Sequence, residues 1–357
     1  MHLKAVILAG GFATRLRPLS CTRPKILFPI VNKPLLQWTY ERLAKNNVKD
    51  VILAVFYQTE VHIKQHRIPR CGLQVYFSRD PLRKPLGTGG AIKRTEKHVG
   101  HDSPFLALNG DTFADIDYSK MLNQHEKNKC TATIALHEVQ DPSRYGVTTL
   151  ARDNRIKGFF EKPSSRRTPG NLINAGTYVF SPRIFKYIPE GRTVSIEREV
   201  FPKLVEEHEL YGYVHRGLWT DIGKPEDYKE LNRTLLDKDG GRLDYKGEGV
   251  IIKGPVDFDK DVRIGRGSII GPYTVLGHNV TIGNFVDIEN SILLPGTDVS
   301  DHAQVHNAII GEGVYIGKKV NVREGCIVGD HARVEDNVSF PGGASICPAK
   351  EVSEEGF

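Results

Sequence analysis

In the first 235 residues, short apolar and β-branched runs alternate with stretches whose apolar residues recur at helical spacing. The run AVILA (5–9) predicts a buried strand, and DVILAVF (50–56) predicts the next one. Between them, NKPLLQWTYERLAKNN predicts a helix with Asn32 as its N-cap and Pro34 in its first turn. Four later runs predict further strands: VYF (75–77), FLALNGD (105–111), TATIAL (131–136) and AGTYVF (175–180). Strand, helix and strand at this spacing predict a Rossmann-like, mostly parallel α/β sheet with ligands at the carboxyl ends of its strands.

A different period begins after residue 249. Apolar residues from Ile252 to Leu294 fall six apart, the register slips at 295–309, and the period resumes from Ile310 to Ile346. Small or β-branched residues stand four positions after most of these anchors, as expected if two positions per hexad point inward. This pattern predicts a parallel β-helix, and resemblance to other hexapeptide-repeat proteins implies the left-handed form. The predicted organisation is therefore an α/β domain (1–235), a Gly- and charge-rich linker (236–249) and a β-helix domain (250–357).

Composition narrows the class of protein. The net charge of +6 comes from 49 Lys and Arg interspersed with 43 acidic residues, which favours a small anionic ligand over nucleic acid. The five cysteines lie far apart with no C-x-x-C pair, so neither a disulfide framework nor a zinc site is expected, as fits a reducing cytoplasm. No apolar run is long enough for a signal peptide or a membrane span, so we expect no membrane partner.

The first forty residues contain six Lys or Arg and no acidic residue. After the first strand, Gly10 and Gly11 let the backbone approach a ligand and present N–H groups to phosphate, although a plain tight turn would look the same. Arg15 offers a planar fork for phosphate oxygens, and Lys25 offers a compact charge after Pro24. This pattern is neither a P-loop nor a complete dinucleotide fingerprint.

LAGGFATRLRPLS followed by RPKILFPI resembles the signature of the sugar-1-phosphate nucleotidyltransferases, the nucleotide-sugar pyrophosphorylases. The resemblance covers nearly the whole chain, because further motifs follow in the family's order: PLGTGGAI (85–92), LNGD (108–111), RYGV (144–147), EKP (161–163), NAGTYVF (174–180) and WTDIGKPEDY (219–228). One departure is Ala13, where the family's loop usually has a third glycine. If that position requires a positive φ, alanine costs on the order of 1 kcal/mol.

The resemblance implies that a sugar-1-phosphate oxygen attacks the α-phosphorus of an NTP, releasing pyrophosphate and an NDP-sugar. The metal carboxylates for Mg²⁺ would be Asp111 and Asp221, each of which could alone be a turn cap. Lys25 would neutralise charge on the phosphates, Arg15 would bind the triphosphate, and Lys162 would bind the sugar phosphate. The nucleotide would also contact Leu8, Gly10, Gly11, Gly87 and Thr88, and the sugar would contact Glu161, Gly146, Asn174 and Gly176.

The motifs leave alternatives open. GTP and mannose-1-phosphate, giving GDP-mannose, are the favoured substrates, but uridylyl- and thymidylyltransferases for glucose-1-phosphate share every catalytic motif. A catalytically weak regulatory paralogue that binds NDP-sugar is a second hypothesis, supported by Ala13. A third is an acyltransferase using one of the repeat histidines, His302, His306 or His331, as general base. We expect a homo-oligomer, a dimer or a tetramer, because β-helix edges and faces commonly pack on a second subunit.

Overall fold

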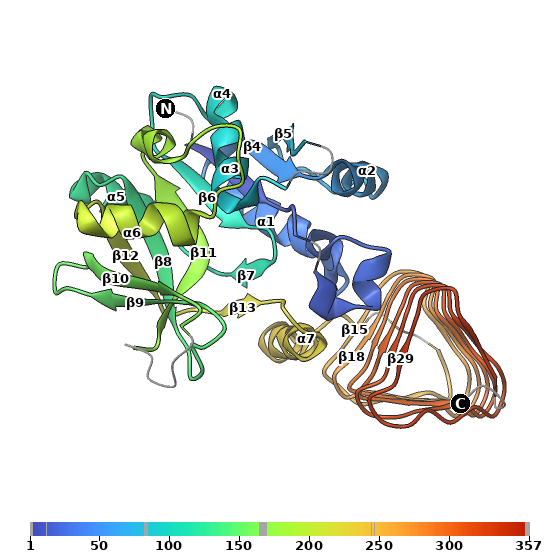
Figure 1. Ribbon diagram of the computed structural model, residues 1–357. Coiled ribbons are helices and arrows are strands. Elements are labelled where there is room, and N and C mark those ends of the chain that lie inside the picture. The colour runs from blue at the N-terminus through green and yellow to red at the C-terminus, as the bar shows by residue number, and fades with distance from the viewer. Residues whose placement is uncertain are drawn as a thin grey trace. The chain divides into compact units, whose positions relative to one another are not determined.

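The structure is a computed structural model that describes residues 3–11, 13–81, 85–163, 170–243, 245 and 247–353. Two compact units are present (Figure 1). The sheet unit consists of residues 1–11 and 35–221, and the β-helix unit consists of residues 12–34 and 222–357. The segment 12–34, which carries Arg15 and Lys25, therefore belongs to the β-helix unit although it follows the first strand of the sheet. The boundaries at 235 and 250 stay a prediction.

Nine strands of the described chain form the mixed sheet of the sheet unit. Its parallel half places β1 between β4 and β6, with β5 outside β4. Its antiparallel half is built around β11, which pairs with β6, β8 and β9, while β12 runs parallel to β8. Each predicted run overlaps one of these strands. The strands are β1 (Leu3–Leu8), β4 (Val48–Val55), β5 (Gln74–Arg79), β6 (Phe105–Asn109), β8 (Ala132–Glu138), β9 (Gly146–Leu150), β10 (Ile156–Glu161), β11 (Leu172–Phe180) and β12 (Leu210–His215).

Helices between these strands bury the centre of the sheet. Ala5, Val6 and Ile7 are consecutive and fully buried, so β1 is covered on both faces, as is typical of a parallel sheet. Helix α1 packs against β4, α3 against β1, and α5 against β8 and β12. The helical segments of this unit are α1 (Leu35–Lys45), α2 (Tyr57–Gln65), α3 (Gly87–Arg94), α4 (Glu96–Val99), α5 (Tyr118–Asn128), α6 (Phe201–Glu206), a 3-10 helix (Pro182–Tyr187) and a π-helical turn (Ile196–Val200).

The turn before α1 differs from its prediction. Val31 and Asn32 both have positive φ, 48° and 58°, and they join β2 (Pro29–Ile30) to β3 (Lys33–Pro34) in a tight antiparallel hairpin. Two consecutive positive φ values are the signature of a type I′ turn. The predictions that Asn32 caps the helix and that Pro34 lies in its first turn are therefore wrong. Tertiary contacts explain the difference, because Asn32 Nδ2 donates to Asp257 Oδ2 at 2.8 Å rather than capping a helix.

The described part of the β-helix unit contains three parallel sheets, whose stacked coils are seen nearly end-on in Figure 1. Helix α7 (Pro225–Asp239) precedes them. One sheet contains β14 (Ile251–Ile252), β17 (Ile269–Ile270), β20 (Asp287–Glu289), β23 (Gln304–His306) and β26 (Asn321–Val322). The second contains β15 (Val256–Phe258), β18 (Thr274–Leu276), β21 (Ile292–Leu293), β24 (Ile309–Ile310), β27 (Ile327–Val328) and β29 (Ser345–Ile346). The third contains β16 (Arg263–Ile264), β19 (Thr281–Ile282), β22 (Asp298–Val299), β25 (Tyr315–Ile316), β28 (Arg333–Val334) and β30 (Glu351–Val352).

Three sheets of parallel strands, each two or three residues long, confirm the predicted β-helix and are consistent with the left-handed form. Most of the anchors read from the hexads face inward; Ile270, for example, pairs in register with Ile288, and both belong to one continuous core. Each coil buries its row against its neighbours, which is the stacking that hexad repeats produce.

The register slips at two corners, of which one falls within the predicted range 295–309 and the other precedes it. Leu276 pairs with Leu293, and Leu293 pairs with Ile310, so Leu293 rather than Leu294 is the inward anchor of its coil. Two corners, after Ile288 and after Val305, are each one residue shorter than a hexad. In the first short corner, Asn290 has φ 47° and the Ser291 hydroxyl donates to the Glu289 carbonyl at 2.7 Å.

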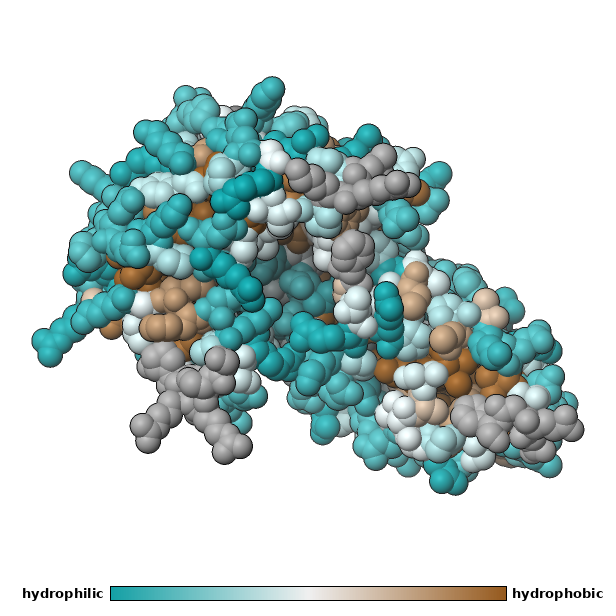
Figure 2. Space-filling view, in the orientation of Figure 1, coloured by the Kyte–Doolittle hydropathy of each residue, from teal (hydrophilic) through white to brown (hydrophobic). Residues whose placement is uncertain are grey.

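Most of the surface facing the viewer in Figure 2 is hydrophilic. Three large apolar side chains of the β-helix unit are nevertheless more than half exposed: Leu243, Ile251 and Phe285. None of the helices formed by the described residues combines the length and apolar character that crossing a membrane requires.

Candidate active site

The carboxyl end of β1 leads into the glycine pair. Leu8, the last residue of β1, pairs with Ala54 on one side and Asn109 on the other. A Cβ built on Gly10 would lie 3.5 Å from the Phe56 ring, an ordinary contact, and a Cβ on Gly11 would meet no atom of the described residues within 4 Å. The open space beside Gly11 leaves room for a ligand to approach its backbone. Contact of Leu8, Gly10 and Gly11 with a nucleotide stays a prediction.

The two predicted metal carboxylates are brought together by a short ladder. Strand β7 (Thr112–Ala114) pairs antiparallel with β13 (Trp219–Asp221), and Asp221 lies opposite Thr112, the residue after Asp111. The preceding residue, Gly110, donates its N–H to the Leu8 carbonyl at 2.8 Å and so ties this turn to the end of β1. Asp111 and Asp221 are both partly exposed. The ladder therefore places two carboxylates, distant in sequence, at neighbouring positions beside the carboxyl end of the central strand.

The β9–β10 hairpin carries the residues predicted to bind the sugar phosphate. Glu161 pairs with Gly146 across the hairpin, and a Cβ on Gly146 would lie 2.8 Å from Glu161 Oε2 and 2.7 Å from the Phe159 ring. Burial, followed by the charge of Glu197, raises the pKa of Glu161. Because Gly146 has no Cβ, the Glu161 carboxylate can pack against the backbone of the neighbouring strand.

Lys162 follows Glu161 in a strained backbone conformation. Its φ is 46°, and its N–H donates to the Tyr145 carbonyl at 3.1 Å. The ammonium lies 3.7 Å from Glu161 Oε1, and the side chain is 60% exposed. Left-handed backbone at a lysine is unfavourable and is often found at functional sites, where surrounding structure enforces it. The conformation leaves the cation beside the carboxylate and accessible to an anion.

A bulge in β11 holds Asn174 and Gly176. The ladder with β8 is irregular between Asn174 and Tyr178, and Gly176 has φ 69°, with Asn109 only 2.7 Å from where a Cβ would stand. Asn174 accepts from the Gly176 N–H at 3.0 Å and donates to the Tyr178 hydroxyl at 3.0 Å. Its side chain therefore maintains the bulge, and contact of Asn174 and Gly176 with a sugar stays a prediction.

Further contacts place these groups in one neighbourhood of the sheet unit. Trp219, from the strand that carries Asp221, donates its indole N–H to the Ala175 carbonyl of the bulge at 3.0 Å. Burial raises the pKa of Tyr178 most, and the charges of Glu197, Glu161 and Asp111 raise it further. Tyr178 thus lies among the acidic groups predicted for metal and for sugar. Sequence reasoning missed Tyr178 and Glu197, because neither carries a local signal of a binding role.

Gly87 and Thr88 begin helix α3 and contact the π-helical turn. Gly87 has φ 69°, and the Thr88 hydroxyl donates to Glu197 Oε2 at 2.7 Å and accepts from the Ile196 N–H at 3.0 Å. The Gly89 N–H donates to the Val194 carbonyl at 2.9 Å. The Thr88 hydroxyl is therefore used inside the protein, and contact of Gly87 and Thr88 with a nucleotide stays a prediction.

Residues 13–34 carry Arg15 and Lys25, and we call this segment the basic loop. It lies in the β-helix unit. Ala13 has φ 46° and ψ 38°, so this position does require the left-handed conformation, and its carbonyl accepts from the Ser20 hydroxyl at 2.8 Å. Arg15 is exposed in the 3-10 helix Thr14–Leu16, which is followed by another at Leu19–Cys21. Lys25 begins the 3-10 helix Lys25–Leu27 after Pro24, and Lys25 is only 9% exposed. The exposed fork of Arg15 suits a polyanion, whereas Lys25 is held in a more enclosed setting.

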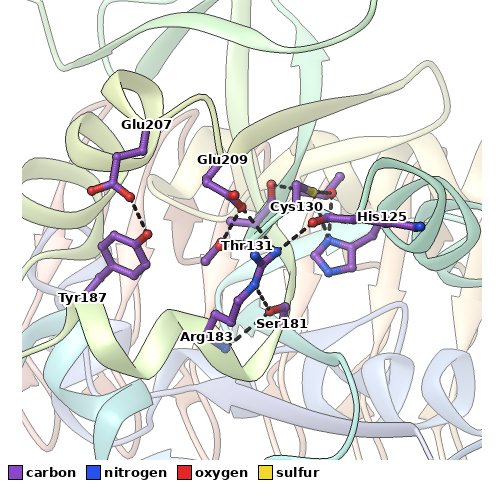
Figure 3. A network of polar contacts seen from close by, with 11 residues as sticks. His125, Cys130, Thr131, Ser181, Arg183, Tyr187, Glu207 and Glu209 are labelled. Atoms are coloured by element: carbon purple, nitrogen blue, oxygen red, sulfur yellow. Dashed lines mark hydrogen bonds and ion pairs between the residues drawn. The ribbon is translucent and has the colours of Figure 1, made fainter.

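A buried cysteine lies beside a buried histidine, as in the catalytic pair of a cysteine nucleophile, and Figure 3 shows both in a network of polar contacts. Cys130 Sγ lies 3.5 Å from His125 Nδ1. Burial raises the pKa of the Cys130 thiol and lowers that of His125 to about 4, so both are neutral near pH 7. A neutral buried thiol is a poor nucleophile. All five cysteines are free, as expected.

The repeat histidines make separate contacts. His302 stacks on Phe285, with ring centroids 5.2 Å apart, and His306 Nε2 lies 3.4 Å from Asp287 Oδ2. His331 packs over Gly313, where a Cβ would come within 2.6 Å of its ring. These contacts are ordinary for the outer face of a β-helix, and within the described chain no group of three or more His, Cys, Asp or Glu side chains could hold a metal ion.

Comparison with known proteins covers both units. The family described as nucleotidyl transferase matches residues 4–238, and the GMPPB C-terminal domain matches residues 252–356. Mannose-1-phosphate guanylyltransferase 1 of Arabidopsis thaliana is 34% identical over 98% of this chain and 97% of its own. Mannose-1-phosphate guanyltransferase of Aspergillus fumigatus is 36% identical over 99% of this chain and 98% of its own. The crystal structure of HddC from Yersinia pseudotuberculosis complexed with GMP-PN has a TM-score of 0.55 and 32% identity, covering 65% of this chain and 99% of that one. The chain belongs to the nucleotidyl transferase family, and it is a nucleotidyltransferase enzyme by that membership.

Proposed function

We propose that this enzyme transfers GMP from GTP to mannose-1-phosphate, forming GDP-mannose and releasing pyrophosphate. The observation that carries the proposal is similarity across both units, over almost the full length, to proteins named for that reaction in a plant and a fungus. The GMPPB C-terminal domain match and the likeness to HddC in complex with GMP-PN support a guanine nucleotide.

The reaction brings together two polyanions, so the side chains have to neutralise charge and hold the reactants in line. An oxygen of mannose-1-phosphate forms a bond to the α-phosphorus of GTP, and the bond from that phosphorus to pyrophosphate breaks. Arg15 and Lys25 would bind the triphosphate, and Lys162 would bind the phosphate of mannose-1-phosphate. Glu161 would accept hydrogen bonds from sugar hydroxyls. No side-chain nucleophile is required.

Nucleotidyltransferases of this family generally use a divalent metal, and we propose that the metal is Mg²⁺, held by Asp111 and Asp221. The neighbouring ladder positions of the two carboxylates fit this ion, because Mg²⁺ is usually bound by one or two carboxylates together with waters and substrate phosphates. When bound, Mg²⁺ would stabilise charge on the phosphate oxygens.

The protein would recognise the nucleotide mainly through backbone groups. Leu8, Gly10 and Gly11 end the central strand, and the loop at Gly87 and Thr88 opens a helix whose side-chain hydroxyl is already engaged. Gly146, Asn174 and Gly176 would shape the sugar site from β9 and the β11 bulge. Two of these three positions are glycines with another side chain within 3 Å of the Cβ they lack.

A pyrophosphate-release assay with Mg²⁺ tests the proposal, crossing GTP, UTP, dTTP, ATP and CTP with mannose-1-phosphate, glucose-1-phosphate and glucosamine-1-phosphate. We expect GTP with mannose-1-phosphate to be preferred at least tenfold, and Asp111→Asn and Lys25→Ala to lose at least 100-fold in turnover. The exposed residues Asp102 and Lys45 supply matched controls, Asp102→Asn and Lys45→Ala. Another preferred pair would refute the substrates, and full activity in Asp111→Asn or Lys25→Ala would refute the site.

If no pair of nucleotide and sugar phosphate releases pyrophosphate, in protein that still binds GDP-mannose, catalysis is refuted and the regulatory paralogue is favoured. The left-handed backbone conformation of Ala13 is the observation that supports this second candidate function. Reversion by Ala13→Gly would then separate a loop defect, which glycine would repair, from a loss elsewhere.

We further propose a cytoplasmic homo-oligomer, a dimer or tetramer, with no nucleic-acid or membrane partner. The exposed apolar side chains of Leu243, Ile251 and Phe285 on the β-helix unit support subunit contacts. Light scattering of the purified chain tests this, and the mass of a monomer at micromolar concentration would contradict it.

A further inference from the structure

The basic loop is attached to the β-helix coils by partly buried polar contacts. The Thr22 hydroxyl donates to Asp330 Oδ2 at 2.6 Å. The next residue, Arg23, forms an ion pair with Glu312 and lies 3.7 Å from Asp330 Oδ2. These two loop residues stand between Arg15 and Lys25 in the chain, so the attachment lies in the middle of the segment predicted to bind the triphosphate.

Asp330 uses its two oxygens for different purposes. Oδ1 accepts from the Glu312 N–H at 2.8 Å, which closes a turn of the preceding coil. Asp301 and Asp336 make the same kind of bond, accepting from the N–H groups of Asn284 and Lys318 at 2.7 Å. The turn bond therefore recurs along the β-helix, whereas Oδ2 of Asp330 is the oxygen that contacts the loop.

Two of the three charged side chains in this contact are largely withdrawn from solvent. The Arg23 side chain is 8% exposed and that of Asp330 is 4% exposed, whereas that of Glu312 is 42% exposed. Leaving one member of a buried ion pair without its partner is strongly destabilising, so the loop is held where Arg23 can meet Asp330. A loop that moved away would give up the ion pair of Arg23 and the hydrogen bond of Thr22 together.

A second attachment holds the other end of the loop. The Val31 N–H donates to Asn232 Oδ1 at 2.7 Å, and Asn32 Nδ2 donates to Asp257 Oδ2 at 2.8 Å. Lys25 lies in the chain between the two attachments, with only one residue separating it from Arg23. Its backbone is consequently fixed from both sides by groups of the β-helix unit.

We propose that Asp330 is a positioning residue for the nucleotidyl transfer: the β-helix coil holds Thr22 and Arg23, and thereby sets the position of Arg15 and Lys25 for the triphosphate. The inference rests on the proposed function of those two cations. It gives the β-helix a part in catalysis in addition to any role in subunit contacts.

The variant that tests the proposal is Asp330→Asn, which keeps an oxygen for the turn bond but removes the charge that faces Arg23. We expect kcat to fall at least tenfold and KM for GTP to rise at least threefold. KM for mannose-1-phosphate should stay within twofold, because its binding residues belong to the sheet unit. Hydrogen exchange of peptides within residues 13–31 should be faster in the variant, a measurement that does not depend on activity.

Asp336→Asn is the matched control, since it alters the same turn bond in the next corner without any loop contact among the described residues. It should leave kcat, both KM values and loop exchange within twofold of the parent. Thr22→Val tests the same attachment from the loop side, removing the 2.6 Å hydrogen bond without changing the β-helix, and it serves if Asp330→Asn does not fold.

The outcomes separate this inference from the proposed function. If Asp330→Asn, or Thr22→Val in its place, matches Asp336→Asn in kcat and in KM for GTP, positioning is refuted, whatever the exchange rates. If Lys25→Ala keeps full turnover, the proposed site is refuted, and the inference is refuted with it. A loss of kcat with KM for GTP unchanged would also overturn the proposal, because the loop cations would then hold GTP as they do in the parent.

Discussion

Gly146→Ala tests whether the β9–β10 hairpin forms the sugar site. The added Cβ would lie 2.8 Å from Glu161 Oε2 and 2.7 Å from the Phe159 ring, where ordinary contacts are 3.4 Å or more. The carboxylate and the ring must therefore each shift by more than about 0.5 Å. Phe159 packs against Phe201 with ring centroids 5.2 Å apart, so the ring has little freedom and Glu161 should move most.

The magnitude follows from what Glu161 would contribute. Overpacking of a well-packed site costs about 1–3 kcal/mol in the free energy of unfolding. A hydrogen bond between a charged group and a sugar hydroxyl contributes about 1.5–3 kcal/mol, so losing it should raise KM for mannose-1-phosphate roughly tenfold or more. KM for GTP should change less than twofold. Steady-state kinetics with each substrate varied in turn measures both values.

Gly158→Ala is the matched control, because Gly158 lies in the same hairpin but a Cβ there would meet Phe160 and Thr149 instead of Glu161. Phe160 is 46% exposed and can yield. The control should lower stability slightly and leave both KM values within twofold. If Gly146→Ala binds mannose-1-phosphate as the parent does while its stability falls, the placement of Glu161 at the sugar is refuted.

Two further predictions concern stability. Ala13→Gly relieves a φ of 46°, so the free energy of unfolding should rise by about 0.5–1 kcal/mol after the larger chain entropy of glycine is counted, and a lower melting temperature would contradict this. Burial lowers the pKa of His125 from 6.5 to about 4, so the unfolded chain binds more protons between these pH values and stability should fall as pH is lowered through them, by up to about 3 kcal/mol. Urea unfolding across this range measures the slope, and an equal slope in His125→Asn would refute the assignment.

The β-helix could be predicted from the sequence because every coil needs an apolar residue at each inward position. The slip was harder to place, because Ile292, Leu293 and Leu294 are consecutive and each could serve as the anchor. Pairing of Leu293 with both Leu276 and Ile310 decides among them. Apolar spacing therefore identifies the architecture, whereas the anchor of an individual coil is fixed only by its pairing with the coils on either side.

The strands were also predictable from their apolar runs, and the short ladder places Asp111 and Asp221 at neighbouring positions, where their binding of a metal stays a prediction. The I′ hairpin at Val31 and Asn32 was not predictable, because its contacts come from residues far along the chain, Asn232 and Asp257. A local rule favoured a helix cap for Asn32, whereas the folded chain uses its side chain in a tertiary hydrogen bond to Asp257.

Asp330 shows most clearly where sequence reasoning ends. In the sequence it is one of several aspartates at β-helix corners, and Asp301 and Asp336 close their turns with the same hydrogen bond. Only the folded chain shows that its second oxygen faces Thr22, a residue from the opposite end of the sequence. A repeated structural aspartate thereby gains a second contact without any change in its own motif. Because that contact is made to the loop between Arg15 and Lys25, we expect a substitution more than 300 residues along the chain from these cations to change the reaction through the position of the loop.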